Sequence, residues 1–215
     1  PASPYGASKL ACEVLLNTYH ALHKMETINL RLFSVYGPDL RQDCVPYLIA
    51  SALLKGKPFT VFGDGTSMRD YIEVSDVLDA LDAACRCKET NLTLNIGSGF
   101  GTRLLDLIAL LEKHLARKTE LVYKPAVPGE LALAVPDISL AMEKLHWEPK
   151  GAIEDGIHVA RLHIRPMILH HRVRLHHVGP DLASPCDLRL LRVETLQLLP
   201  FLVPHQLIDL GAQDF

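Results

Sequence analysis

Apolar residues recur along the first 150 positions at two different spacings. Segments with apolar residues three or four apart predict helices; they cover residues 4–24, 45–56, 75–87 and 102–115. Runs rich in β-branched and aromatic residues that end in turn residues predict strands; they cover residues 27–38, 59–65, 69–74, 92–99 and 120–125. Short strands that alternate with helices of this length indicate an α/β protein with a largely parallel sheet.

The first expected helix begins with a candidate catalytic pair. Ser3 fits the N-cap, and Pro4 fits the first helical position because its absent N–H would be unpaired there. Tyr5 and Lys9 follow four residues apart, which places them on one face about one turn from each other. A lysine cation favours the phenolate form of a nearby tyrosine, so Tyr5 would exchange protons near neutral pH. Chance alone also produces this spacing, so its meaning depends on the surrounding sequence.

The glycine cluster NIGSGFGT, residues 95–102, stands where a dinucleotide-binding turn would stand, after a strand and before a helix. Thr102 occupies the place of the third glycine in the GxGxxG pattern. The next expected strand ends in Lys124 rather than in an acid that could hold a ribose. The sequence therefore favours a structural turn over a cofactor site here.

The amino-acid composition argues against several classes of protein. Apolar residues make up 48% of the 215 residues and the net charge is −3, which excludes a disordered chain and disfavours a nucleic-acid binder. Five cysteines without CxxC spacing fit a reduced setting better than a disulfide framework or a zinc site. Since no apolar run reaches about 18 residues, we expect a soluble, cytoplasmic protein without a membrane partner.

Six segments then occur in an informative order: SPYGASKLACE, LRLFSVYGP, FGDGTSMRDYIEVSDV, LNIGSG, PGELALAVPDISLA and LHWEPK. Together they resemble the C-terminal half of the extended short-chain dehydrogenase/reductases, and more narrowly the NAD-dependent nucleotide-sugar epimerase/dehydratase family. The resemblance covers about residues 1–165. It implies a partial Rossmann-like, doubly wound parallel sheet interleaved with a smaller substrate-binding α/β domain. In this family the NAD pyrophosphate turn lies in the N-terminal half, so we expect the chain to start in mid-protein.

The resemblance assigns catalytic and cofactor-binding roles. Tyr5 resembles the general acid/base that takes a proton from a sugar hydroxyl while hydride passes to NAD. Lys9 resembles the residue that binds the nicotinamide ribose and tunes that tyrosine. Phe33 and Val35 would lie beside the nicotinamide ring, and Ser34 would face the substrate. Oxidation to a transient keto sugar is the shared first step of the family's epimerases, dehydratases and decarboxylases.

Other positions resemble the family's substrate-binding residues. Arg69 matches the arginine that clamps the diphosphate, a role suited to a planar bidentate donor; the alternative is a surface arginine paired with Asp70. Thr60 and Phe62 match the strand that lines the nucleobase pocket, although Phe62 could equally be a core residue. Glu130 stands where the family's acid approaches the nucleotide ribose.

A few positions depart from the family pattern or have a structural interpretation. Val127 stands where many members place a second phosphate-binding arginine, and losing such a contact would cost about 2 kcal/mol of binding free energy. His146 replaces a glycine before Trp147, which we expect to form a packing corner. Asp76 and Asp137 are expected to be helix-capping acids rather than catalytic ones.

Residues 166–215 form a Leu- and His-rich tail that the resemblance leaves unassigned. The tail holds twelve leucines, and no lysine follows Lys150. The doublets His170-His171 and His176-His177 lack a cysteine partner or HExxH spacing, so no metal site is expected. Residues 188–203 could form a short amphipathic helix or a partner-binding segment.

The sequence thus predicts an NAD-dependent nucleotide-sugar epimerase or dehydratase. Its expected substrate is a nucleotide-diphosphate sugar, most simply a UDP-sugar. The complete protein would be a homodimer, because this family commonly pairs through the helix that carries YxxxK. The alternative is a truncated, non-catalytic chain that binds a nucleotide sugar or a protein partner.

Overall fold

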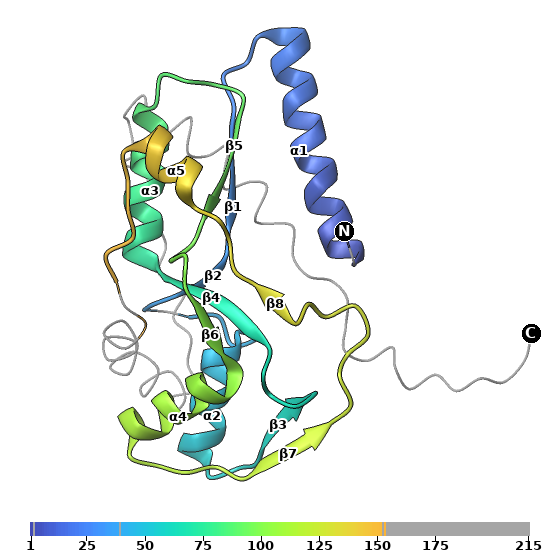
Figure 1. Cartoon of the computed structure of the whole chain (residues 1–215), viewed down its shortest axis with the longest axis vertical. Coiled ribbons are helices and arrows are strands. Elements are labelled where there is room, and N and C mark those ends of the chain that lie inside the picture. The colour runs from blue at the N-terminus through green and yellow to red at the C-terminus, as the bar shows by residue number, and fades with distance from the viewer. Residues whose placement is uncertain (2, 39, 152, 154–215) are drawn as a thin grey trace, which may run out of the picture. The chain divides into compact units, whose positions relative to one another are not determined.

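The computed structural model describes residues 1, 3–38, 40–151 and 153, which form helices and strands in alternation (Figure 1). The helices are α1 (Pro4–His23), α2 (Val45–Lys55), α3 (Val74–Arg86), α4 (Leu104–Leu115) and α5 (Ser139–Leu145). The strands are β1 (Ile28–Leu32), β2 (Ser34–Tyr36), β3 (Phe59–Phe62), β4 (Met68–Glu73), β5 (Leu92–Ile96), β6 (Gly101–Arg103), β7 (Leu121–Lys124) and β8 (Leu133–Ala134). The predicted α/β class is confirmed.

The chain divides into two compact units, residues 1–176 and 177–215, and all the described elements belong to the first. The predicted boundary between residues 1–165 and the tail 166–215 lies outside the described residues and stays a prediction, as do the histidine doublets and segment 188–203. No helix in the described part of the chain is long and apolar enough to cross a membrane. No cluster of three or more His, Cys, Asp or Glu suited to a metal occurs in that part either.

The first helix begins and ends as its sequence predicts. The Ser3 hydroxyl accepts a hydrogen bond from the Gly6 N–H at 3.1 Å, and Pro4 opens the helix. Lys24 ends α1 in the left-handed conformation. The apolar face of α1, however, contains no buried residue among those described; Leu16 is half-buried, and the other large apolar side chains are 44–71% exposed.

The segment 27–38, expected to be one strand, forms two strands in different sheets. β1 pairs in parallel with β5, and β2 pairs in parallel with β4. Between them, the Phe33 N–H still donates to the Ile96 carbonyl at 3.0 Å. The chain therefore crosses from one sheet to the next at Phe33, which carries Ser34 and Val35 onto the edge of β4.

The described strands form three sheets. β1 pairs with β5, β3 pairs with β7, and β4 pairs with β2, β6 and β8. Among the described strands, only β4 and β6 run antiparallel to each other. The prediction of a largely parallel arrangement holds, although it is distributed over separate sheets.

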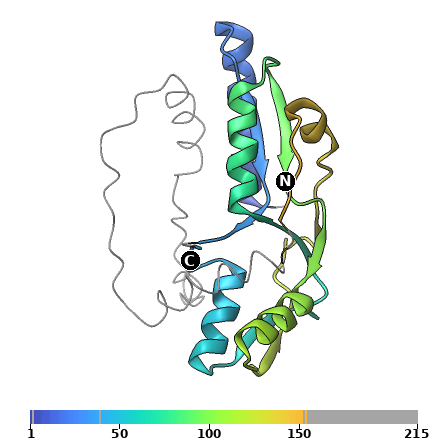
Figure 2. The ribbon, with the colours of Figure 1, turned by 90° about the vertical axis from the view of Figure 1, so that its left-hand side faces the viewer.

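Two hydrophobic cores meet at β4. One core packs β5, α3 and α5 around Ile72, Leu94 and Trp147. The other packs α2 and α4, which lie side by side (Figure 2), against Val61 of β3 and Tyr71 of β4. Successive side chains of a strand point to opposite faces, so the neighbours Tyr71 and Ile72 enter different cores.

Several helix ends differ from the sequence prediction. Glu73 rather than Ser75 is the N-cap of α3, and its carboxylate accepts from the Ser75 N–H at 2.8 Å. Asp76 lies in the first turn, where its charge is favourable, but its carboxylate accepts from the Gly151 N–H at 2.9 Å and does not cap the helix. α4 begins at Leu104 rather than 102 because β6 precedes it.

The segment around α5 behaves as the sequence predicts. The Asp137 carboxylate accepts from the Ser139 N–H at 2.9 Å, at the first residue of α5. His146 ends this helix in the left-handed conformation that a glycine would adopt without strain. Trp147 is buried, and its indole N–H donates to the Asp76 carbonyl at 3.0 Å. This hydrogen bond fixes the packing corner onto α3.

Candidate functional site

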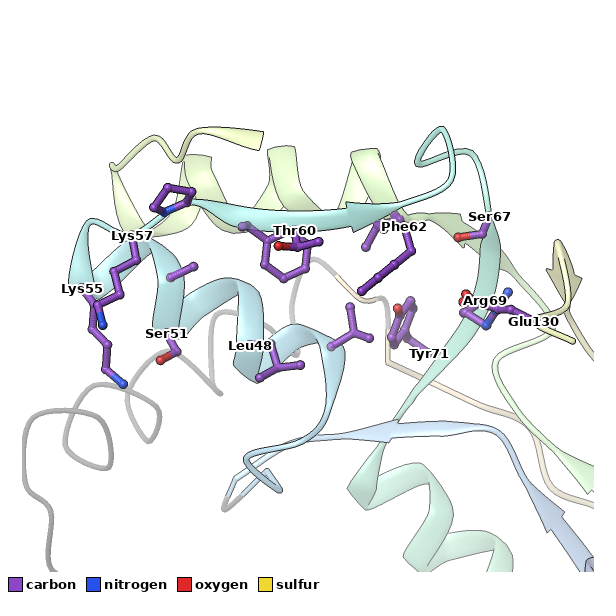
Figure 3. Close-up of a pocket in the computed structure, with 15 residues that line it drawn as sticks. Leu48, Ser51, Lys55, Lys57, Thr60, Phe62, Ser67, Arg69, Tyr71 and Glu130 are labelled. Carbon is purple, nitrogen blue, oxygen red and sulfur yellow. Dashed lines mark hydrogen bonds and ion pairs between the residues drawn. The ribbon is translucent and has the colours of Figure 1, made fainter. Parts of the chain in front are cut away.

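A pocket of about 480 Å³ lies between α2, β3 and β4 (Figure 3). Four residues that the sequence nominated for substrate binding line it: Thr60, Phe62, Arg69 and Glu130. They come from β3, β4 and the loop before β8, segments up to 70 positions apart in the chain. The fold therefore brings together four of the five residues nominated for substrate binding, all but Ser34, while their binding role remains a proposal.

Two of these residues face the pocket from β3, because successive side chains of a strand point to opposite faces. Thr60 and Phe62 face the pocket, whereas Val61 between them is fully buried in the core with α2 and α4. The Phe62 side chain is 47% exposed, so the interpretation of Phe62 as a core residue is wrong. Its ring is instead a wall of the pocket.

Arg69 and Glu130 form an ion pair at the pocket. The Arg69 guanidinium donates to Glu130 Oε1 at 2.9 Å and to the Met68 carbonyl at 2.9 Å. The alternative partner, Asp70, is fully buried and makes its hydrogen bonds elsewhere. The interpretation of Arg69 as a surface residue paired with Asp70 is therefore wrong.

Asp70 holds the turn between β5 and β6. Its carboxylate accepts from the backbone N–H groups of Ser98 and Gly99 at 2.8 and 2.7 Å, and from the Ser98 hydroxyl at 3.0 Å. Burial raises the pKa of the Asp70 carboxyl, and these donors oppose that rise. A Cβ at Gly97 would lie 2.6 Å from Pro136, so the close approach requires glycine. The Asp70 carboxylate thus already accepts hydrogen bonds from two backbone N–H groups of this turn. The turn therefore has a structural role, as the sequence indicated.

Sequence reasoning missed other residues of the pocket. Tyr71 lines it together with Arg69, as expected for every second residue of one strand, and Ser67, just before β4, lines it too. Alternation along β4 could have identified Tyr71 once Arg69 was nominated. Lys55, at the end of α2, and Lys57, in the following loop, also line the pocket, and no motif marked them.

The candidate catalytic pair lies on α1. The Lys9 ammonium is 5.6 Å from the centroid of the Tyr5 ring, so the predicted contact across one helical turn is present. Half of the Tyr5 surface is exposed. Arg41, in the loop after β2, has a pKa raised by its hydrogen bond to Asp43 and, to a smaller extent, by Tyr5. The start of α1 thus lies within electrostatic reach of that loop.

The candidate cofactor-side residues form a separate group. Phe33, Ser34 and Val35 are half-buried where the chain crosses from β1 to β2. Neither they nor Tyr5 and Lys9 line the pocket. Ser34 is nevertheless the register partner of Tyr71, which does line it. β2 and β4 thus place the expected sugar-facing residue next to the pocket strand.

Comparison with known proteins agrees with this arrangement. The parallel strands, their covering helices and the solved structures that match them define a Rossmann-type α/β protein. The model of the NAD dependent epimerase/dehydratase family matches residues 1–97, and this part of the chain belongs to that family.

Three relatives illustrate the similarity. An uncharacterized UDP-glucose epimerase, YtcB of Bacillus subtilis, is 34% identical over 158 residues, which are 73% of this chain and 50% of that protein. The UDP-glucose 4-epimerase of Mycolicibacterium smegmatis is 35% identical over 162 residues, 73% of this chain and 51% of that protein. The UDP-glucuronic acid 4-epimerase of Bacillus cereus, solved with UDP-glucuronic acid and NAD, matches with a TM-score of 0.75 and 34% identity, covering 78% of this chain and 54% of that one. The chain spans about half the length of the relatives it matches.

Proposed function

We propose that the chain provides the substrate-binding part, and the Tyr–Lys pair, of an NAD-dependent enzyme that epimerises or dehydrates a nucleotide-diphosphate sugar. The observation that carries the proposal is the convergence of Thr60, Phe62, Arg69 and Glu130 on one pocket. Relatives named as UDP-glucose epimerases, a UDP-glucuronate 4-epimerase and dTDP-glucose 4,6-dehydratases support it. A UDP-sugar is the first substrate to test.

Each pocket residue has a chemical role in this proposal. Arg69 supplies the positive charge and the paired donors that a diphosphate requires. Glu130, already within 2.9 Å of Arg69, accepts hydrogen bonds from the ribose hydroxyls beside that diphosphate. The exposed Phe62 ring covers the nucleobase, and Thr60 on the same face of β3 lines the same part of the pocket.

The residues present fit the nicotinamide end of NAD. A phenol and an ammonium lie one helical turn apart on α1, and Phe33 and Val35 provide apolar surface at the β1–β2 crossing. The glycine turn 97–101 does not fit the pyrophosphate, because its amides bind Asp70. We therefore assign Tyr5, Lys9, Phe33 and Val35 to the nicotinamide riboside.

The proposed reaction uses two groups of this chain. Tyr5 takes the proton of a sugar hydroxyl and later returns it, while Lys9, in contact with the Tyr5 ring, binds the nicotinamide ribose. NAD, when bound, would supply the redox chemistry: it would accept the hydride of the carbon that bears this hydroxyl and give a hydride back when the ketone is reduced. The sugar passes through a transient ketone, and Ser34 at the β2 edge orients its hydroxyl groups.

Replacing Tyr5 by phenylalanine tests the catalytic assignment. In the complete protein, Tyr5→Phe should lower kcat for a UDP-sugar at least about a hundredfold, because general acid/base catalysis is lost, while NAD binding stays within about twofold. Tyr19→Phe, which removes the hydroxyl of another exposed tyrosine of α1, is the control and should leave kcat unchanged. An unchanged kcat in Tyr5→Phe would overturn the assignment.

A second candidate function is nucleotide-sugar or protein binding without catalysis. It is favoured by one observation: the pocket is lined entirely from residues 45–130, whereas α1 with Tyr5 and Lys9 lines none of it and buries no residue. In this reading the apolar face of α1 associates with a partner or a second copy. Light scattering would then show association of the 215-residue chain, whereas a monomer that converts a UDP-sugar would exclude it.

The remaining proposals concern the complete protein. We place it in the cytoplasm, in keeping with its free cysteines, and as a homodimer that pairs through α1. Its exposed apolar residues, among them Val14, Leu15 and Leu22, are the surface that such pairing would cover.

A further inference from the structure

Tyr71 is a buried polar side chain of the pocket to which the sequence analysis gave no role. Its side chain lines the pocket and the residue is only 5% exposed. Figure 3 shows Tyr71 and Arg69 projecting from β4 toward the space below Phe62. Burial raises the pKa of Tyr71 to about 12, so its hydroxyl keeps its proton and remains a donor at neutral pH.

The Tyr71 hydroxyl lacks a partner within the described part of the chain. No described residue forms a hydrogen bond with it, whereas the carboxylate of Asp70, on the other face of β4, accepts from Ser98 and Gly99. The hydroxyl is not one of the fully buried, unsatisfied polar atoms of the described chain; it belongs to a side chain that lines the pocket, and a donor that opens on a cavity is suited to a polar ligand. The unpaired donor therefore points to a group that enters the pocket.

The register of β4 indicates which part of a ligand would lie next to the Tyr71 hydroxyl. Arg69 is paired with Thr102 of β6 and Ala134 of β8, whereas Tyr71 is paired with Ser34 of β2. Two residues along a strand advance about 7 Å. A ligand that follows β4 from Arg69 thus passes Tyr71 before it reaches Ser34, the proposed sugar-facing residue.

We infer that the Tyr71 hydroxyl donates a hydrogen bond to the sugar-side phosphate of a nucleoside diphosphate sugar held by Arg69. This inference rests on the proposed function and adds a binding residue to it. Val127, close to Glu130 in the loop before β8, is exposed and apolar and offers no charge to a phosphate. In this chain Tyr71 thus supplies, as a neutral donor, a contact to the second phosphate beside the Arg69 guanidinium.

The inference predicts a specific loss of affinity. UDP carries the sugar-side phosphate and UMP does not, so titration calorimetry of the 215-residue chain with both nucleotides isolates the contact. Tyr71→Phe should weaken UDP binding about tenfold or more, as expected for a hydrogen bond to a charged group. The same substitution should leave UMP binding within about twofold. Tyr123→Phe, which removes the hydroxyl of an exposed tyrosine outside the pocket, should change neither.

A second measurement follows the Tyr71 ring directly by NMR. In the unsubstituted chain with 13C-labelled tyrosine rings, UDP should shift the Cζ resonance of Tyr71 and UMP should not.

The outcomes separate the two proposals. If Tyr71→Phe binds UDP as tightly as the unsubstituted chain, or loses UDP and UMP equally, the inference is wrong and the proposed function stands. If the unsubstituted chain binds no UDP, the proposed function fails and the assignment of Tyr71 fails with it.

Discussion

Consecutive residues of β4 serve different parts of the molecule, because a strand turns successive side chains to opposite faces. Arg69 and Tyr71 line the pocket. Asp70 instead accepts the hydrogen bonds of the β5–β6 turn, and Ile72 packs in the core with α3 and α5. Substitutions one position apart therefore test different properties: ligand binding in one case and folding in the other.

Replacing Asp70 by alanine should lower the free energy of unfolding by about 3 kcal/mol. The side chain is fully buried, and its loss leaves the N–H groups of Ser98 and Gly99 without their acceptor. Urea denaturation measures the change. Asp82→Ala is the control: its carboxylate is exposed and paired with Arg86 in solvent, so the loss should stay below about 0.5 kcal/mol. Equal losses in the two variants would contradict the structural role given to Asp70.

At the scale of elements, α1 is attached by polar contacts. Because it buries no described side chain, the helix gains little from the hydrophobic effect in this part of the chain. Glu13 accepts two hydrogen bonds of 2.7 Å from Arg31 of β1, and the Asn29 amide donates weakly to Asn17 at 3.5 Å. These contacts hold the helix that carries Tyr5 against β1.

The ion pair of α1 predicts a pH dependence. The Arg31 hydrogen bond holds the pKa of Glu13 below its ordinary value, so its stabilisation is present above that value and is lost as pH falls through the folded-state pKa. At pH 7, Glu13→Gln should lower the free energy of unfolding by about 0.5–1 kcal/mol, a small value because half of Arg31 is exposed and screened by solvent.

Urea denaturation at several pH values measures this difference. The gap between the unsubstituted chain and Glu13→Gln should close as pH falls below the ordinary glutamate range. Glu120→Gln, at an exposed residue, is the control and should show no gap at any pH. A Glu13 gap that stays constant on acidification would show that the ion pair does not hold α1.

Element boundaries were predictable where a local signal sets them. Ser3 with Pro4 defines the start of α1, and Gly56 in the left-handed conformation defines the end of α2. The division of segment 27–38 was not predictable, because it depends on β5 and β4, which lie far along the chain. Local sequence patterns predict helix ends well, but they do not predict which sheet a strand joins.

At the scale of the whole molecule, the motifs nominated residues and the fold decided which of them meet. Thr60, Phe62, Arg69 and Glu130 were nominated separately and share one pocket. Tyr71 was not nominated, although it lies two residues from Arg69 on the same face of β4 and strand alternation would have identified it. The sequence alone could not show that Asp70 accepts hydrogen bonds from the amides of the glycine turn. These amides, of Ser98 and Gly99, lie 28 and 29 residues further along the chain.

The central claim is that this pocket binds the nucleoside diphosphate part of a nucleotide sugar. The most direct test is to titrate the 15N-labelled chain with UDP and follow the backbone amide resonances. The account predicts saturable shifts in β3 around Thr60 and Phe62, in β4 around Arg69, and at Glu130, with none in α3. The absence of saturable shifts, or shifts confined to the glycine turn 97–101, would contradict it.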